Sequence, residues 1–97
     1  MPSYISLCRW TALGASKLKE SPTRLDAVKK DLADNGVKLL NFYMTMGKYD
    51  MVIIADAPSD EALAKAMLPI LAQGAVTMQT SRAFDESEYR QIFSSLS

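Results

Sequence analysis

The sequence of 97 residues contains no histidine, and this absence excludes more classes of function than any other feature of its composition. A serine–histidine triad, a histidine-ligated haem, a typical zinc site and a histidine general base all require that residue. Catalysis would therefore depend on Tyr, Asp, Glu, Lys or Arg side chains, or on a bound cofactor. The sequence itself predicts no metal site and no cofactor.

Cysteine and long apolar runs are equally scarce. Cys8 is the single cysteine, so an internal disulfide is impossible, and its apolar surroundings indicate a small buried side chain rather than a reactive thiol. This cysteine usage favours a reducing compartment. The N-terminus has no basic segment followed by an apolar one, and no apolar run approaches the roughly 20 residues that cross a bilayer. We therefore expect a cytoplasmic protein that does not associate with membranes.

An excess of charge of one sign is also missing. Eleven Lys and Arg residues balance eleven Asp and Glu residues, so the net charge gives no reason to expect nucleic-acid or anionic-membrane partners. With 48% hydrophobic and 23% charged residues, the composition is that of a globular protein. The length fits one domain over residues 1–97.

Hydrophobic periodicity divides the chain into four strands and two long helices. We predict strands over residues 4–11, 37–46, 51–57 and 75–84. The helices are expected to begin at the N-caps Ser21 and Ser59 and to end at Gly36 and Gly74, because serine caps helix starts and glycine ends helices.

Three further segments complete the prediction. Residues 12–20 are expected to form a loop, and Pro69 should kink or split the last turns of the second helix because proline removes a helical hydrogen bond. Residues 85–97 form a short C-terminal helical tail, which a capping box at Asp85 would begin.

The resulting βαββαβ order predicts an α+β, ferredoxin-like fold with a four-stranded antiparallel sheet. Right-handed crossovers place both long helices on one face of that sheet. The middle two strands are apolar on both faces, and strict alternation puts Val37, Leu39 and Tyr43 opposite Leu40, Phe42, Met44 and Met46. Because helices cover one face only, the other would be a large apolar patch. We therefore expect two copies to pair through their sheets as a homodimer, or as a higher homo-oligomer.

Five short motifs carry a family likeness. They are Trp10-Thr11 with Gly14, Ser21-Pro22 with Arg24, Gly47-Lys48-Tyr49-Asp50, Ala57-Pro58, and Thr80-Ser81-Arg82-Ala83-Phe84. In this order, over residues 4–84, they resemble the GYD domain family of small bacterial and archaeal proteins. The resemblance implies a dimeric α/β-barrel, a fold similar to that of cofactor-free monooxygenases and muconolactone isomerases. It does not imply one activity, since the same fold serves many functions.

The hairpin motif has a structural and a chemical interpretation. Gly47 and Asp50 are typical turn residues, and Asp50 is expected to accept hydrogen bonds from the backbone of its own turn. In the alternative, Asp50 is a carboxylate at the mouth of a cleft, and Tyr49, Asp50 and Tyr43 are candidate catalytic residues with acid–base roles. Tyr49 also suits a subunit boundary, because its ring is apolar and its tip is polar.

The candidate ligand-binding side chains are aromatic or cationic. Arg82 requires a carboxylate partner, which is either structural or part of a small anionic ligand. Lys17 and Arg24 lie near the exposed amides at the start of the first helix, where an anion could bind, and the alternative is a solvated basic loop. The predicted pocket combines Trp10, Tyr43, Tyr49 and Arg82. Its aromatic side chains could equally fill a dimer core.

Three functions stay open at this point. The first is a small-molecule binding or sensing protein that acts as a homo-oligomer, which the absence of histidine favours. The second is a small enzyme of the dimeric α/β-barrel type, similar to an isomerase or a cofactor-independent oxygenase. The third is a purely structural or assembly protein.

Overall fold

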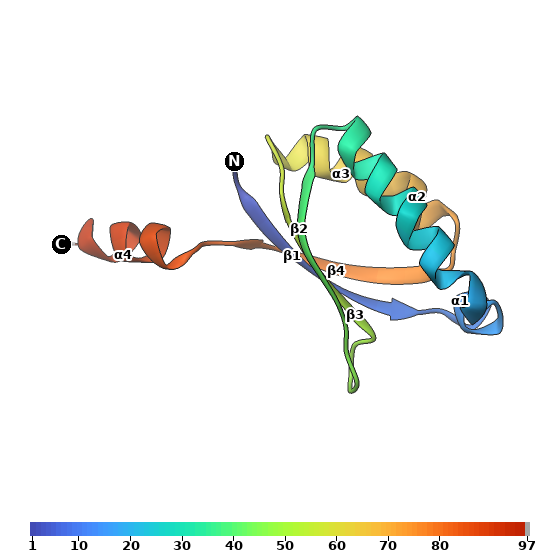
Figure 1. Cartoon of the computed structure of the whole chain (residues 1–97). Helices are drawn as coiled ribbons and strands as arrows, with labels where there is room; N and C mark the ends of the chain where they lie inside the picture. The colour runs from blue at the N-terminus through green and yellow to red at the C-terminus, as the bar shows by residue number, and fades with distance from the viewer. Residues whose placement is uncertain (97) are drawn as a thin grey trace.

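The computed structural model describes residues 1–96, which form four strands and a set of helices (Figure 1). The strands are β1 (Ser3–Trp10), β2 (Lys38–Met44), β3 (Met51–Asp56) and β4 (Val76–Ala83). The long helices are α2 (Ser21–Asp34) and α3 (Asp60–Ala72), and the shorter ones are α1 (Ala12–Ser16), the 3₁₀-helix η1 (Leu18–Glu20) and α4 (Glu86–Ser94).

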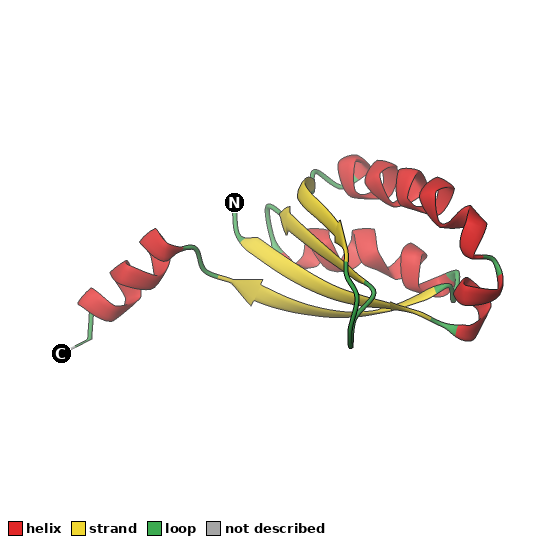
Figure 2. Ribbon diagram, turned by 60° about the horizontal axis from the view of Figure 1, so that its bottom comes forward, coloured by secondary structure: helices red, strands yellow, loops and turns green. Residues whose placement is uncertain are grey.

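The strands form one antiparallel sheet in the order β2-β3-β1-β4. β1 and β3 occupy its centre, and β2 and β4 lie at its two edges. Figure 2 shows α2 and α3 on the same face of the sheet. The predicted α+β ferredoxin-like fold is confirmed.

The prediction of a loop over residues 12–20 is wrong, because the chain forms α1 and η1 there. The Thr11 hydroxyl caps α1 by accepting a hydrogen bond from the Gly14 N–H at 3.1 Å, and it donates to the Gly74 carbonyl at 2.5 Å. Gly14 fits because it lacks a side chain, since a Cβ there would lie 2.0 Å from the Ala75 carbonyl oxygen. The close approach of α1 to the start of β4 therefore requires glycine.

The two long helices begin differently. The prediction that Ser21 caps α2 is wrong: Ser21 is the first residue of the helix, because η1 delivers the chain already in a helical conformation. Ser59 caps α3 as predicted and accepts a hydrogen bond from the Ala62 N–H at 3.1 Å. The prediction that Pro69 splits α3 is wrong as well. Pro69 is exposed, so water can bind the Lys65 carbonyl that a proline leaves without a donor.

β2 carries an irregularity that alters its two faces. The register with β3 shifts between Leu39 and Asn41, which leaves Leu40 as an extra residue in a β-bulge. Beyond the bulge, Phe42 lies on the same face as Leu39, toward the helices, and Tyr43 lies on the opposite face. The prediction that Leu39 and Tyr43 share a face is therefore wrong, because strict alternation does not survive an inserted residue.

The core lies between the sheet and the two long helices. The one buried polar side chain among residues 1–96, Ser6, is hydrogen-bonded to the Thr80 hydroxyl at 2.8 Å, so no penalty for an unpaired hydroxyl arises. The buried apolar side chains are Tyr4, Cys8, Leu32, Val37, Met51, Ile53, Ala55, Ala57, Leu63, Ala66, Ile70 and Ala75.

The opposite face of the sheet has no cover within residues 1–96. Tyr43, which is 53% exposed, lies on this face. A polar margin includes the Ser3 hydroxyl, which donates to the Asp56 carboxylate at 2.6 Å. We call this surface the open sheet face. Its centre consists of half-buried apolar side chains from the two central strands, namely Ile5, Leu7, Val52 and Ile54.

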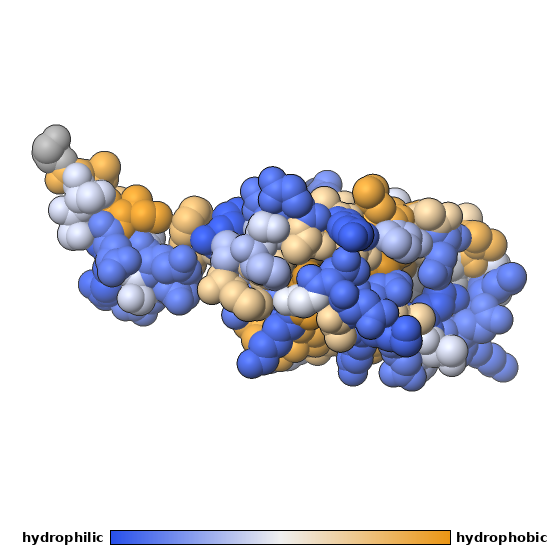
Figure 3. Space-filling view, turned by 90° about the horizontal axis from the view of Figure 1, so that it is seen from above, coloured by the Kyte–Doolittle hydropathy of each residue, from blue (hydrophilic) through white to orange (hydrophobic). Residues whose placement is uncertain are grey.

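Helix α4 extends from the end of β4 as an arm, apart from the sheet and the other helices (Figure 2). Asp85 caps it as predicted, through a capping box with Glu88. Hydrophobic surface is visible on the arm in Figure 3. Within residues 1–96, no helix is both long enough and apolar enough to cross a membrane.

Candidate functional site

The hairpin motif connects three strands through Asp50. Its carboxylate accepts a hydrogen bond from the Trp10 N–H at 2.9 Å, and its own N–H donates to the Cys8 carbonyl at 2.8 Å, both on β1. Its carbonyl accepts from the Thr45 N–H at 2.8 Å on the side of β2. The prediction that the carboxylate binds the backbone of its own turn is therefore wrong, because it satisfies the backbone of β1 instead.

The two candidate catalytic tyrosines lie at the open sheet face. The Tyr49 hydroxyl donates to the Gln79 side-chain oxygen at 2.7 Å, so the ring reaches from the hairpin to β4. Gln79 is the register partner of Leu7, whose side chain points to that face. The Tyr43 hydroxyl accepts from the Asn41 amide at 3.4 Å on the same face of β2. Neither tyrosine lines the cavity under the helices.

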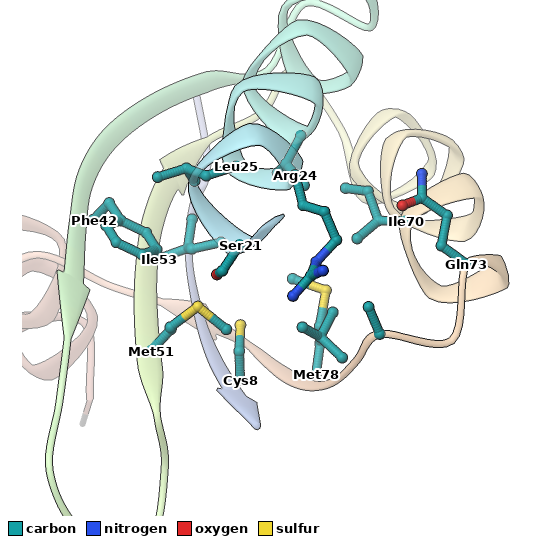
Figure 4. A pocket seen from close by; sticks show the side chains of 13 residues that line it. Cys8, Ser21, Arg24, Leu25, Phe42, Met51, Ile53, Ile70, Gln73 and Met78 are labelled. Atoms are coloured by element: carbon teal, nitrogen blue, oxygen red, sulfur yellow. The ribbon is translucent and has the colours of Figure 1, made fainter. Parts of the chain in front are cut away.

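That cavity has a volume of about 50 Å³ and lies between the sheet and helices α2 and α3 (Figure 4). Its floor contains Cys8, Met51 and Met78, which are register partners on three adjacent strands. Figure 4 shows their sulfur atoms turned toward the same space. One water needs roughly 10–15 Å³ of such space, so this cavity is small and has room for a few waters or for a short apolar group.

Arg24 stands at the edge of the cavity. Its guanidinium donates to the backbone carbonyls of Lys17 at 3.1 Å and Gly14 at 3.4 Å, and it lies 3.7 Å from the Glu20 carboxylate. The Lys17 side chain is exposed. Arg24 thus links the α1–η1 segment to α2 through these contacts. Its side chain is 20% exposed and borders the cavity, whose lining is almost entirely apolar.

Cys8 has the environment of an unreactive thiol. It is 2% exposed, and burial raises the pKa of its thiol to about 11. The thiolate is the nucleophilic form, so Cys8 carries almost none of it near neutral pH. Its position confirms the predicted buried side chain.

Arg82 belongs to a separate cluster at the other end of the sheet. Its guanidinium lies over the rings of Phe84 at 4.5 Å and Tyr4 at 5.9 Å, and 3.5 Å from the Glu88 carboxylate. The Tyr4 hydroxyl donates to Asp60, and this hydrogen bond raises the pKa of the tyrosine. The carboxylate partner of Arg82 is therefore part of the fold, and it comes from α4.

The predicted pocket residues are not brought together. Trp10 pairs with Val76 at one end of β1, whereas Arg82 pairs with Tyr4 at the other end. The indole nitrogen of Trp10 is buried and has no hydrogen-bond partner within residues 1–96. In the same part of the chain, His, Cys, Asp and Glu side chains form no group of three that could hold a metal ion.

Sequence reasoning did not single out Gln79, Met51 or Met78. Gln79 accepts a hydrogen bond from the hydroxyl of Tyr49, which is 30 residues away. The two methionines are the register partners of Cys8 on the neighbouring strands. Such contacts follow from strand pairing, and no local sequence signal encodes them. The candidate site that results has two parts, the apolar cavity bordered by Arg24 and the open sheet face with its tyrosines.

Comparison with known proteins decides the family. The sequence profile of the GYD domain matches residues 4–93. The chain belongs to the GYD domain family. The expected resemblance is thereby confirmed, over a longer stretch than the five motifs cover.

One relative of this GYD domain protein carries a functional description. It is a protein from Thermus thermophilus described as "Glutamine synthetase and cystathionine beta-lyase binding protein". The two sequences are 34% identical over 84 residues, which is 86% of this chain and 88% of the relative.

Two solved structures illustrate the similarity of the fold. A hypothetical protein from Pyrococcus horikoshii superposes with a TM-score of 0.57 at 17% identity and covers 89% of this GYD domain protein and 93% of its own chain. A protein from Thermus thermophilus gives a TM-score of 0.54 at 22% identity, with 87% and 94% coverage. At these identities the likeness shows the fold alone.

Proposed function

We propose that this protein is a homodimeric binding protein without catalytic chemistry, and that its ligands are other proteins. The observation that carries the proposal is the open sheet face. It presents an apolar centre with a polar margin, which is the arrangement of a protein–protein interface. Pairing two such faces removes apolar area from water at about 25 cal/mol per Å², before the costs of association.

The geometry argues against an enzyme. Tyr43, Tyr49 and Asp50 would have to converge on one reacting group to act as acid and base. Tyr43 and Tyr49 instead lie on the open sheet face, and one oxygen of Asp50 is engaged by the Trp10 backbone. The cavity of about 50 Å³ contains none of these three side chains.

The nature of the partner is taken from the Thermus relative. That protein is described as binding glutamine synthetase and cystathionine beta-lyase, and it is similar over most of both chains. We infer that this GYD domain protein binds enzymes of the same two kinds.

The dimer is tested by light scattering coupled to size-exclusion chromatography. The wild-type protein should elute with the mass of two chains, and Val52→Asp should elute as a monomer, because the substitution places a charge at the centre of the open sheet face. Ala64→Asp, on the exposed side of α3, is the matched control and should stay dimeric. Circular dichroism verifies that both variants are folded. A monomeric wild-type protein would contradict the dimer.

The partner is tested separately by biolayer interferometry with purified glutamine synthetase and cystathionine beta-lyase from the source organism. Saturable binding of either enzyme is the expected result. A flat response to both enzymes, with a dimeric protein on the sensor, would remove the second half of the proposal and leave the first intact.

A small anionic ligand is the second candidate, and the position of Arg24 favours it. This guanidinium lies at the edge of an apolar cavity, where a carboxylate with a short apolar tail could bind it. A thermal-shift screen of aliphatic and aromatic carboxylates is the test. A stabilising compound should lose its effect in Arg24→Ala and keep it in Glu20→Ala, and no shift with any compound would dismiss this candidate.

A further inference from the structure

The exposed apolar side of α4 has no partner within residues 1–96. No other helix or strand of residues 1–96 packs along this arm. Phe93, for example, is 55% exposed, although its ring lies 4.6 Å from that of Tyr89. The exposed apolar side chains are three or four residues apart, which places them on one face of the helix. They are Tyr89, Ile92, Phe93 and Leu96.

The arm is held in a definite direction. Asp85 and Glu88 form both hydrogen bonds of a capping box at its first turn. Glu88 also pairs with Arg82 on β4 at 3.5 Å, and Arg82 in turn covers the ring of Phe84 in the connecting segment. These contacts fix the start of α4 relative to the sheet, so its apolar side is presented to something outside the chain.

A second unpartnered apolar surface lies on β2 and the hairpin that follows it. Met46 is 96% exposed and Met44 is 69% exposed. Met44 lies on the same side of β2 as Phe42, whereas Tyr43, which is 53% exposed, lies on the open sheet face, so β2 is apolar and exposed on both sides at this end. Lys48 in the same hairpin is exposed, and its ammonium group lies 5.7 Å from the centre of the Tyr49 ring. Flexible methionine side chains adapt well to aromatic partners.

The two surfaces lie at opposite ends of the sheet. The arm follows Ala83, which pairs with Ser3 at the start of β1, whereas the hairpin precedes Met51, which pairs with Cys8 near the end of β1. Five steps of about 3.3 Å between Ser3 and Cys8 separate these ends by roughly 17 Å. The arm also leaves β4 away from the hairpin (Figure 1), so the two surfaces of one chain do not meet. The arm leaves the β4 edge and the hairpin lies at the β2 edge, so a twofold axis that crosses the strands obliquely would bring the arm of each copy to the hairpin of the other.

The size of the exposed surface agrees with this pairing. The accessible surface is 6524 Å², whereas a compact monomer of this mass has about 5,500 Å². The radius of gyration is 14.7 Å, compared with about 12.5 Å for a compact chain of this length. The excess of about 1,000 Å² is close to the roughly 800 Å² that each partner buries in a standard interface.

We propose that α4 is an exchanged arm, whose apolar side packs on the β2–β3 hairpin of a second copy of this chain. The inference rests on the proposed homodimer and assigns two further contacts to it. Each copy both gives an arm and receives one, so the assembly closes at two chains.

The first test measures the dimer dissociation constant by analytical ultracentrifugation. Ile92→Glu should weaken the dimer at least about tenfold, because a charge enters an apolar contact. Gln91→Glu, which adds the same charge on the other side of the same helix, should leave the constant unchanged. Met46→Glu should reproduce the effect of Ile92→Glu from the receiving surface.

The second test detects the contact itself. Phe93→Cys and Met46→Cys chains are mixed, allowed to exchange, and treated with a short bismaleimide. A crosslinked pair should form in this mixture and not in a mixture of Gln91→Cys with Met46→Cys.

The outcomes separate the arm from the dimer. A wild-type dimer that Ile92→Glu does not weaken, or that gives no Phe93–Met46 crosslink, overturns the exchanged arm and leaves the sheet-to-sheet dimer standing. A monomeric wild-type protein overturns both. Binding of a different protein to the arm of an unchanged dimer also overturns the proposal.

Discussion

Asp50 supplies a hydrogen-bond acceptor where the pairing between β1 and β3 ends. Asp50→Ala should lower the free energy of unfolding by about 1–3 kcal/mol, because the partly buried Trp10 N–H would lose its acceptor. Asp50→Asn keeps a side-chain oxygen at that position and is the matched control, with a smaller loss expected. Urea unfolding monitored by circular dichroism measures both. Equal losses in the two variants would show that the carboxylate oxygen is not what stabilises β1.

Cys8 should make the stability of the protein depend on alkaline pH. Burial raises its thiol pKa from 9.0 to about 11, so the folded state holds the proton more tightly than the unfolded state. The resulting contribution is complete below pH 9 and is lost as the pH rises toward 11.

The measurement compares wild type with Cys8→Ala. The difference between their free energies of unfolding should shrink by about 2 kcal/mol between pH 8 and pH 11, since one pKa unit corresponds to 1.36 kcal/mol. Comparing the two proteins cancels the titration of Tyr4, which is present in both. A difference that stays constant over this range would contradict the assigned pKa.

At this scale the sequence identified residue types better than contacts. Asp50 was predictable as a structural turn residue, but its acceptor role toward Trp10 joins positions 40 residues apart. Arg82 was predictable as half of an ion pair, and its partner Glu88 follows only from the direction in which α4 leaves β4. Partners of this kind depend on tertiary placement, which the local pattern does not contain.

Helix α3 gives a prediction at the scale of an element. Pro69 lies in the interior of an unbroken helix and is exposed. Pro69→Ala should therefore stabilise the protein by about 1–3 kcal/mol, because it restores a donor for the Lys65 carbonyl and removes a poor helix former.

Thermal and urea unfolding measure this effect, and Leu68→Ala, at the neighbouring exposed position, is the control with no more than about 0.5 kcal/mol expected. Destabilisation by Pro69→Ala would mean that the proline bends α3 to fit the sheet.

Helices and strands were predictable where the spacing of apolar residues is regular. Periodicity located all four strands and both long helices, because alternating or helical apolar patterns persist over several residues. It failed over residues 12–20, where α1 and η1 are too short for a period and depend on the close contact of Gly14 with Ala75. It also failed at Leu40, since a bulge leaves no mark in the pattern.

The whole molecule should show mass-action behaviour if it is a dimer. Its melting temperature should rise by about 5–10 °C over a roughly hundredfold increase in protein concentration, because folding is then coupled to association. Differential scanning calorimetry measures the shift, and Val52→Asp should show none. A concentration-independent melting temperature in the wild type would argue against obligate pairing.

The four-stranded antiparallel sheet was predictable from the βαββαβ order, and the position of both long helices on one face from the right-handed crossover rule; the structure has both features. The predicted pocket was less accessible to such reasoning. Trp10 and Arg82 belong to the same pair of strands, yet they stand at opposite ends of it. Two side chains on the same face of a sheet can share a ligand only if they also lie close together along the strands.

The bulge at Leu40 has a consequence for solubility. β2 is an edge strand, and a regular edge offers a row of free N–H and C=O groups on which a foreign strand can grow. The extra residue breaks the spacing of that row, so an incoming strand cannot stay in register along it. Leu40 thus protects an apolar edge from adding strands of other chains, which is a safeguard against aggregation.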